Sequence, residues 1–326
     1  MQAQRFVVLD SAELLPDTWR RLVMGGPVRT FNPGLLEDGA GYVLASRVVL
    51  PDMVRRIALC RLDGDLRPVE RSQLALSDLV RFPADSEVPE RGRSWFADPR
   101  LFRLGGRIFL YWNSGWHDPH NHQFITQLDG ATLEPLGPPR EIVLRDERQP
   151  IEKNWTFFGD GPFFAVYSIV PQRVMRVSLE GTGAIELSEH ARADWDVGEY
   201  ARLYGGLRGG APPQRHGDHM YSICHSNHFE PEGLRYIPAV YRFAAQEPFA
   251  PTDGPARPLA LDNPFGPRNV HERLNPVVGE VLYPCGAVIA GGLWTISYGI
   301  NDEHCAIARV PHEEVLASMR LSLIHI

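Results

Sequence analysis

Short apolar runs, separated by turns that contain glycine or proline, follow one another along most of the chain. Their length and their content of Val, Ile, Phe and Tyr are typical of β-strands. Clear examples are GYVLASRVVL (41–50), RIFLYWNSG (107–115), PFFAVYSIV (162–170), HMYSICHSN (219–227) and LWTISYGIN (293–301). Long amphipathic helical patterns are nearly absent, and short helices are predicted only within 11–23 and 311–320. The pattern indicates an all-β protein.

Five stretches repeat one plan, which is a small polar or proline-containing entry, a strand, a tight turn and an aromatic strand. They begin at Phe31, Phe96, Glu152, Arg208 and Leu282, 56 to 74 residues apart. A period near 60 with about four strands per unit is typical of a β-propeller. We predict a single five-bladed β-propeller domain over residues 1–326, with blades near 26–80, 93–147, 150–198, 203–260 and 273–322. A two-sheet sandwich is the alternative, but it explains neither the shared entry nor the spacing.

The entries predict a binding site. In a propeller the first strand of each blade lines the central channel, so residues at the five entries converge on one funnel. The residues expected there are Asn32, Asp98, Lys153, Arg208 and the Pro284–Gly286 turn.

Composition excludes several classes of protein. The net charge of −7 leaves no basic excess for duplex nucleic acid. The sequence has neither a signal-peptide pattern nor about 18 consecutive apolar residues, so we expect no membrane partner and a cytoplasmic location. Its four cysteines are scattered without a C-x-x-C pair, which argues against disulfides and against zinc. A homo-oligomer is compatible with the sequence.

Taken in order, the entry motifs resemble those of glycoside hydrolase family 130, the β-mannoside phosphorylases, and the allied β-mannosyltransferases. The matching segments run from Asn32 to Arg309 and are NP before an arginine-ended strand, DPR, EKNW, GGAPP…HS and YPCG…YGIND. The resemblance implies a five-bladed propeller and an inverting glycoside phosphorylase. Two positions depart from the family pattern: Ala97 stands where a glutamate is common, and Arg208 where small residues are usual.

The resemblance also implies residue roles. Asp98 would be the general acid that protonates the departing glycosidic oxygen, in some members through a sugar hydroxyl. Inorganic phosphate would be the co-substrate and nucleophile, with no other cofactor and no metal. Its predicted ligands are Lys153, His225, Arg47 and either Arg55 or Arg56. The residues expected to bind an oligosaccharide or glycoside are Asn32, Arg100, Asn154, Arg208, Tyr298 and Asp302.

The residues themselves leave alternatives open. A general acid must be protonated at the working pH, and burial beside Phe96 would raise the pKa of Asp98, but a turn acid paired with Arg100 has the same pattern. Lys153 could be a surface charge paired with Glu152, and His225 a core histidine.

Two further groups have a structural and a functional interpretation. The run WHDPHNH contains His117, Asp118, His120 and His122, which suggest either a metal site or a polar loop that joins strands. The tryptophans near the entries either stack on sugars or pack in the core, and they are Trp95, Trp112, Trp116 and Trp155.

Four activities are compatible with these sequence features. Besides the phosphorylase, they are a glycosyltransferase that uses a sugar phosphate or nucleotide sugar, an inverting hydrolase and a non-catalytic sugar-binding propeller. A hydrolase needs a second carboxylate to activate water, for which only Glu152 and Asp302 lie near an entry. Phosphate already carries charge and needs no base, so Lys153 and His225 favour an enzyme that uses phosphate or a phosphosugar.

Overall fold

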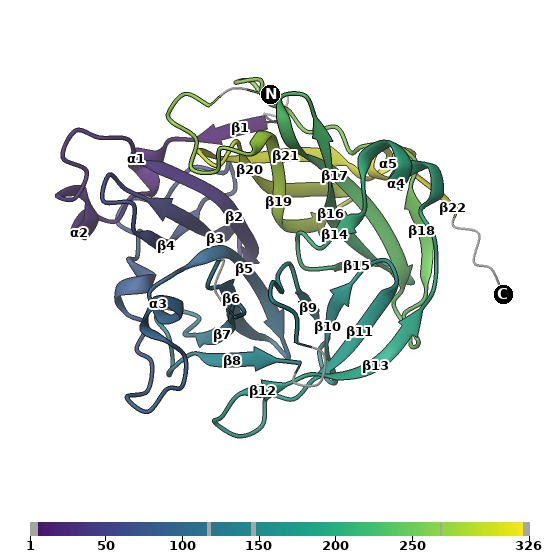
Figure 1. The fold of residues 1–326 in the computed structure, drawn as a ribbon, viewed down its shortest axis with the longest axis horizontal. Coiled ribbons are helices and arrows are strands. Elements are labelled where there is room, and N and C mark those ends of the chain that lie inside the picture. Colours follow the sequence, from purple (N-terminus) through teal and green to yellow (C-terminus); the bar gives the residue numbers. More distant parts are fainter. Residues whose placement is uncertain (1–5, 116–118, 145–147, 268, 322–326) are drawn as a thin grey trace.

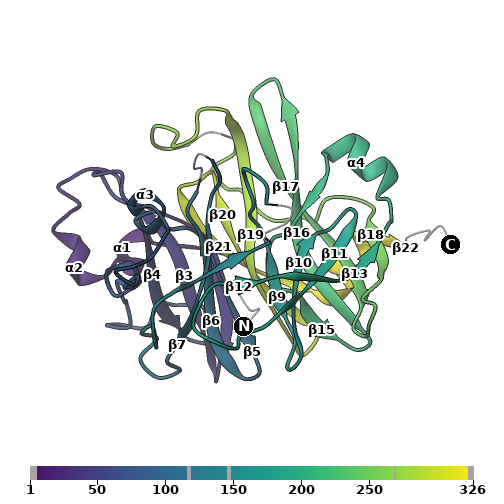
Figure 2. The same cartoon turned by 60° about the horizontal axis from the view of Figure 1, so that its bottom comes forward.

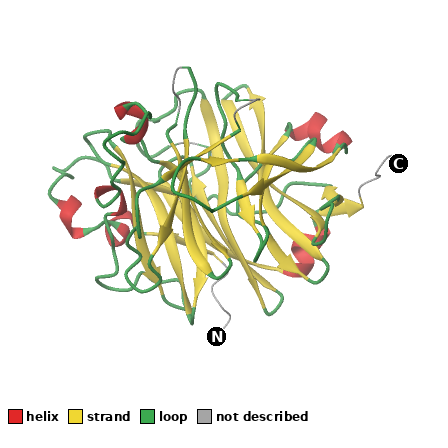
Figure 3. Ribbon diagram, turned by 90° about the horizontal axis from the view of Figure 1, so that it is seen from below, coloured by secondary structure: helices red, strands yellow, loops and turns green. Residues whose placement is uncertain are grey.

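The computed structural model describes residues 6–115, 119–144, 148–267 and 269–321. Strands make up nearly half of the described chain, with short helices at its periphery (Figure 3). The helices are α1 (Ser11–Leu14), α2 (Asp17–Arg20), η1 (Leu76–Asp78), α3 (Glu90–Arg93), α4 (Gly198–Tyr204) and α5 (His312–Ala317). The all-β prediction is confirmed, and α1, α2 and α5 lie within the two segments predicted to be helical.

Three predicted units each form a separate antiparallel sheet around strands that are consecutive in sequence. The first sheet contains β2 (Arg29–Asp38), β3 (Gly41–Val49) and β4 (Arg55–Leu62). The second contains β5 (Ala97–Leu104), β6 (Arg107–Asn113), β7 (Gln123–Leu128) and β8 (Arg140–Val143). The third contains β9 (Thr156–Phe158), β10 (Phe163–Ser168), β11 (Gln172–Val177) and β13 (Ser188–Ala193).

The fourth and fifth predicted units are joined into one ten-stranded sheet. The fourth unit contributes β14 (Leu207–Arg208), β15 (Gln214–His216), β16 (His219–Glu230), β17 (Gly233–Ala244) and β18 (Pro251–Pro255). The fifth contributes β19 (Val278–Ala290), β20 (Leu293–Ile300) and β21 (His304–Pro311). A short parallel pairing of β17 with β19 joins them, at Leu234–Val278 and Tyr236–Val281. Viewed down the shortest axis, the five groups of strands follow one another around a common centre (Figure 1).

Three edge strands pair with sheets that the sequence did not assign to them. The strand β1 (Phe6–Leu9), outside every predicted unit, pairs with β21. The strand β22 (Met319–Leu321), assigned to the fifth unit, pairs with β18 of the fourth, and β12 (Ile185–Glu186) pairs with β8 of the second. An outermost strand is short and partly polar, so its sequence carries little information about the sheet that it joins. The predicted units 150–198 and 273–322 therefore each contain one edge strand that pairs with another unit.

A shared backbone feature lies at three entries. Asn32, Asp98 and Asn154 adopt left-handed conformations, with φ of 51°, 52° and 68°. Asn and Asp tolerate this region better than other non-glycine residues. At Asn32 and Asp98 the strand pairing also shifts register. Such an irregularity bends the strand and redirects side chains, which turns these polar groups out of the regular pleat.

The hydrophobic core lies between the sheets. Trp112 and Trp155 are at most 1% exposed and belong to it, so the alternative in which they stack on sugars is wrong. Cys60, Cys224, Cys285 and Cys305 are buried within the sheets. No helix of the described chain is long and apolar enough to cross a membrane.

Candidate active site

A small cavity of about 120 Å³ gathers polar residues from all five groups of strands or the loops beside them. Its lining residues are Asn32, Arg47, Asp98, Lys153, Tyr236, Asn275, Val278, Val281, Tyr283 and Asp302. Five of these were predicted site residues, namely Asn32, Arg47, Asp98, Lys153 and Asp302. We call this space the carboxylate cavity, because two aspartates line it.

Asp98 is held as a hydrogen-bond acceptor. Its Oδ1 accepts from the Asn32 Nδ2 at 2.8 Å and from an Arg47 guanidinium nitrogen at 3.3 Å. Burial raises the pKa of Asp98, but Arg47, Lys153 and Arg100, together with the Asn32 hydrogen bond, outweigh it, so the pKa is lowered. The expected raised pKa is therefore wrong for the ligand-free protein, because the sequence did not show how many cations surround this carboxylate.

Asn32 reaches Asp98 because a glycine lies beside it. A Cβ built on Gly299 of β20 would lie 2.1 Å from the Asn32 Oδ1, so only glycine leaves room for this amide. The Asn32 Oδ1 has no hydrogen-bond partner in the described structure. The Asn32 amide therefore donates a hydrogen bond to Asp98 through its Nδ2, and its Oδ1 remains an unpaired acceptor.

Arg100 supports the cavity from behind, although the sequence placed it in the substrate site. It is fully buried, and it donates to the Gly210 carbonyl at 2.5 Å and to the Tyr283 hydroxyl at 2.9 Å. It also donates to the Asn154 Oδ1 at 3.2 Å and does not line the carboxylate cavity. Its predicted contact with substrate is corrected to a structural role.

Asp302 follows β20 in a left-handed conformation, with φ of 56°. No side chain or backbone group of the described chain hydrogen-bonds to its carboxyl or forms an ion pair with it. Burial raises the pKa of Asp302 to about 6, although Arg47 opposes the shift, and the negative charge of Asp98 adds to it. Below about pH 6 this carboxyl is therefore protonated in the ligand-free protein.

A larger groove of about 620 Å³ adjoins the carboxylate cavity, since Lys153 and Tyr236 line both. Three predicted residues, Asn154, Arg208 and His225, line this groove. We call it the cationic groove, because the Lys153 and Arg208 side chains are exposed along it.

His225 lies at the wall of the cationic groove. Burial, with Arg100, Lys153 and Arg208 nearby, lowers the pKa of His225 well below its usual value, so the ring is neutral. Neither ring nitrogen has a partner in the described structure, although the ring is 0% exposed. A neutral imidazole supplies one donor and one acceptor, so His225 is equipped to hydrogen-bond a ligand in the groove.

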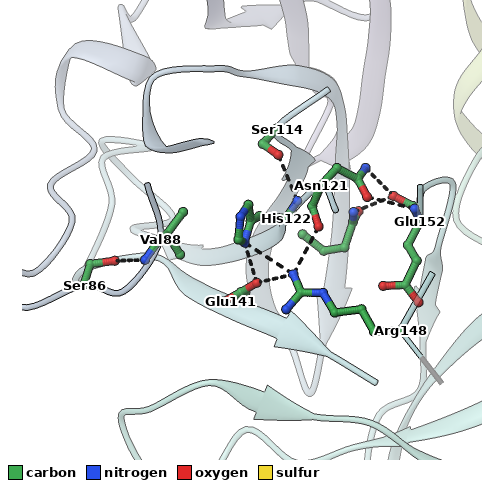
Figure 4. Close-up of polar contacts among 9 residues, drawn as sticks. Ser86, Val88, Ser114, Asn121, His122, Glu141, Arg148 and Glu152 are labelled. Atoms are coloured by element: carbon green, nitrogen blue, oxygen red, sulfur yellow. Dashed lines mark hydrogen bonds and ion pairs between the residues drawn. The ribbon is translucent and has the colours of Figure 1, made fainter. Parts of the chain in front are cut away.

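Buried amides fix the backbone beside Lys153 (Figure 4). Asn121 accepts from the Glu152 N–H at 2.8 Å and donates to its carbonyl at 2.6 Å. Gln123 donates to the same carbonyl at 2.5 Å. The Glu152 carboxyl accepts from the Tyr167 hydroxyl at 2.8 Å, and Glu152 lines neither cavity. Glu152 thus anchors the chain next to Lys153.

The histidine-rich loop forms a separate polar cluster, which we call the His122 cluster (Figure 4). One Glu141 carboxylate oxygen contacts the His122 Nδ1 and an Arg148 nitrogen, both at 2.7 Å. These contacts hold the pKa of Glu141 below its usual value, even though burial raises it. Within the described residues no three His, Cys, Asp or Glu side chains gather as a metal site. Trp116, His117 and Asp118 lie outside the described residues.

Two predicted residues lie elsewhere. Arg55 packs its guanidinium 4.3 Å from the Trp95 ring centroid and donates to the Met53 carbonyl, so it lines neither cavity. Tyr298 is fully buried and donates to the Asp262 carbonyl at 2.8 Å, which makes it a core residue. The predicted phosphate contact of Arg55 and substrate contact of Tyr298 are corrected.

Sequence reasoning missed Tyr236, Tyr283 and Asn275. Side chains alternate between the two faces of a strand. This alternation places Tyr236 of β17 and Tyr283 of β19 on the faces that line the carboxylate cavity. Alternation was visible in both segments, but which face meets the cavity depends on how the sheets are placed.

No family model matches the sequence, and no curated protein matches it. Solved structures are similar in fold. The beta-1,2-mannobiose phosphorylase from Listeria innocua has a TM-score of 0.63 at 15% identity, over 97% of this chain and 99% of its own. A second structure has a TM-score of 0.65 at 12% identity, over 96% of this chain and 93% of its own. It comes from work on the GH130 family of mannoside phosphorylases, which contains glycoside hydrolases that target beta-1,2 mannosidic linkages in Candida mannan.

A GDP-Man-dependent mannosyltransferase from Leishmania mexicana has a TM-score of 0.59 at 12% identity, over 95% of this chain and 89% of its own. At 12–15% identity, the likeness to these neighbours is one of fold. The chain therefore resembles the glycoside hydrolase family 130 structures in fold along almost its whole length, as its entry motifs predicted.

Proposed function

We propose that this protein is an inverting glycoside phosphorylase that acts on β-mannosides or similar glycosides, within one five-bladed β-propeller domain. The observation that carries the proposal is the continuity of two spaces. Asp98 lies in the carboxylate cavity, and the neutral His225 lies in the cationic groove, with Lys153 exposed to both. The similarity in fold to a mannobiose phosphorylase agrees with this assignment.

In this proposal inorganic phosphate binds where the cavity and groove meet. Lys153 attracts it by charge, and the one N–H of the neutral His225 ring donates a hydrogen bond to a phosphate oxygen. A phosphate oxygen attacks the anomeric carbon as the bond to the glycosidic oxygen breaks. That oxygen takes a proton from Asp98 and leaves as an alcohol.

Phosphate binding would also prepare Asp98 for this role. The ligand-free carboxylate is ionised because Arg47 and Lys153 lower its pKa. A bound dianion neutralises those cations, which favours the protonated carboxyl. The acid would then form only in the complex with phosphate, so unproductive cleavage by water is suppressed.

One of the two carboxylates considered for a hydrolase is poorly placed to activate water. An activated water needs an ionised carboxylate as its base. Glu152 lines neither cavity, which leaves Asp302 of the carboxylate cavity as the candidate base. Turnover in phosphate-free buffer would implicate Asp302 in that role.

The test is to incubate the protein with β-linked manno-oligosaccharides, with and without phosphate, and to measure mannose 1-phosphate. We expect product only with phosphate, and oligosaccharide synthesis from mannose 1-phosphate in the reverse direction. Equal cleavage in phosphate-free buffer would identify a hydrolase instead. Failure of every mannoside under both conditions would remove the proposal.

A second candidate is a glycosyltransferase that uses a nucleotide sugar. The cationic groove favours it, because 620 Å³ holds about 20 water molecules at ~30 Å³ each, more than phosphate needs. Arg208 adds an exposed cation where the family usually has small residues. Incubation with GDP-mannose and mannose acceptors distinguishes the two, since only the transferase releases GDP.

A further inference from the structure

The two aspartates of the carboxylate cavity differ in their contacts. Asp98 accepts two hydrogen bonds, from an amide and a guanidinium, and both require a lone pair on its oxygen. Asp302 lines the same cavity with a carboxyl that has no hydrogen-bond or ion-pair partner in the described chain. One carboxylate is therefore committed as an acceptor, whereas the other is available to a ligand.

The charges around Asp302 come from several elements. Arg47 of β3 and Lys153 before β9 are the cations that act on it, and Asp98 of β5 and the adjacent Glu303 are the anions. Tyr236 of β17 and Cys285 of β19 are further titratable groups that interact with it.

Those charges do not stabilise the two carboxylates equally. Arg47 contacts Asp98 directly, at 3.3 Å, whereas no cation within the described residues lies within ion-pair distance of Asp302. Like charges in one cavity disfavour double ionisation, so such a pair tends to hold one proton. At a pH low enough for the pair to hold one proton, that proton resides on the carboxyl with fewer stabilising contacts, and the pKa of about 6 for Asp302 agrees.

We propose that Asp302 is a second catalytic carboxyl, which holds the cavity's proton in the ligand-free protein and passes it through a bound sugar hydroxyl to Asp98. This inference rests on the proposed function. The Asp302 O–H bond breaks as the sugar oxygen gains that proton, and the hydroxyl's own proton moves to Asp98. Asp98 then protonates the departing oxygen, and Asp302 remains ionised until it regains a proton from water.

The test compares two leaving groups in the presence of phosphate. A sugar alcohol needs a proton to leave, whereas a dinitrophenolate leaves without one. For Asp302→Asn we expect turnover of mannobiose to fall by about 10²-fold or more, the usual contribution of general acid catalysis. Turnover of dinitrophenyl β-mannoside should fall less than about tenfold, on the same scale. Asparagine tolerates the left-handed backbone of position 302, so the variant should fold.

Asn275→Ala is the matched control, because Asn275 lines the same cavity and carries no titratable proton. It should lower the turnover of both substrates by the same factor. An equal loss on both substrates in Asp302→Asn, or no loss on either, would overturn the inference while leaving the phosphorylase intact. A wild-type protein that turns over neither substrate would instead count against the proposed function.

A second measurement needs no substrate. An infrared titration of the ligand-free protein should show a protonated carboxyl at pH 5 that disappears in Asp302→Asn and persists in Asp98→Asn. A band lost in Asp98→Asn but kept in Asp302→Asn would place the proton on Asp98 and overturn the inference.

Discussion

The His122 cluster and the carboxylate cavity are both polar regions rich in ionisable groups, yet they differ in how those groups are paired. In the cluster, Glu141 satisfies both His122 and Arg148. In the cavity and the adjoining groove, Asp302 and both nitrogens of His225 have no partner within the described structure. Buried polar groups are normally hydrogen-bonded, so unpaired ones are better indicators of a ligand site. A dense group of histidines is, by itself, a weaker signal.

Asp98→Asn should produce the largest effect. It removes the proposed proton donor while preserving the shape of the side chain, so we expect turnover to fall by about 10²- to 10⁴-fold. Steady-state kinetics with mannobiose and phosphate, alongside isothermal titration of ligand binding, checks this. Binding should persist. Asp38→Asn is the control, since Asp38 pairs with Arg61 away from both cavities, and it should retain wild-type turnover.

Glu141→Gln should instead lower the free energy of unfolding and leave turnover unchanged. It removes a carboxylate that pairs with two partners, and we expect unfolding free energy to fall by about 1–3 kcal/mol. Denaturant unfolding at pH 7 measures the change, with the exposed Glu134→Gln as control. The lowered pKa of Glu141 stabilises the protein above pH 4.5, so the difference should disappear as the pH falls below that value. A tenfold loss of turnover per folded molecule would show that the cluster belongs to the site.

The two aspartates should affect stability with opposite signs. The raised pKa of Asp302 makes the folded protein relatively more stable below pH 3.8 and less stable above about 6. Asp302→Asn should therefore stabilise the protein at pH 8 by roughly 1 kcal/mol, allowing for solvent screening, and have no such effect at pH 3.5. The lowered pKa of Asp98 has the reverse sign, so Asp98→Asn should destabilise the protein at pH 8. Denaturant melts of both variants at the two pH values test this, and equal signs would contradict it.

Arg208→Ala should have the smallest effect. An exposed cation contributes up to about 1 kcal/mol, so the KM for phosphate should rise no more than about fivefold at unchanged kcat. Arg215→Ala is the control, because Arg215 is also exposed on the same sheet but lies outside the cationic groove. A fall in kcat would instead show that Arg208 contacts the reacting groups.

The sequence predicted the architecture better than it predicted the site. The all-β class follows from local strand patterns, and the repeated entries with Asn32 and Asp98 identified the side chains that meet in the cavity. It was not possible to predict which arginines remain available for a ligand. Arg100 and Arg55 look equivalent to Arg47 in sequence, but the first is enclosed by carbonyl and hydroxyl groups and the second packs on Trp95. Those contacts involve residues that are distant in sequence.

The ionisation of Asp98 was mispredicted for the same reason. A local sequence window contains the apolar neighbours that raise a pKa, but the lowering groups Arg47 and Lys153 come from other strands and loops. An argument from burial alone therefore predicted a raised pKa for Asp98, whereas its pKa is lowered. The five-bladed arrangement and the catalytic roles stay predictions that the experiments above address.

The pairing of β1 with β21 has a consequence for biosynthesis. Phe6–Leu9 are translated well before their partners Cys305–Ala308. The fifth group of strands cannot be completed until β21 has left the ribosome, so β1 stays without its partner while all the strands between them are made.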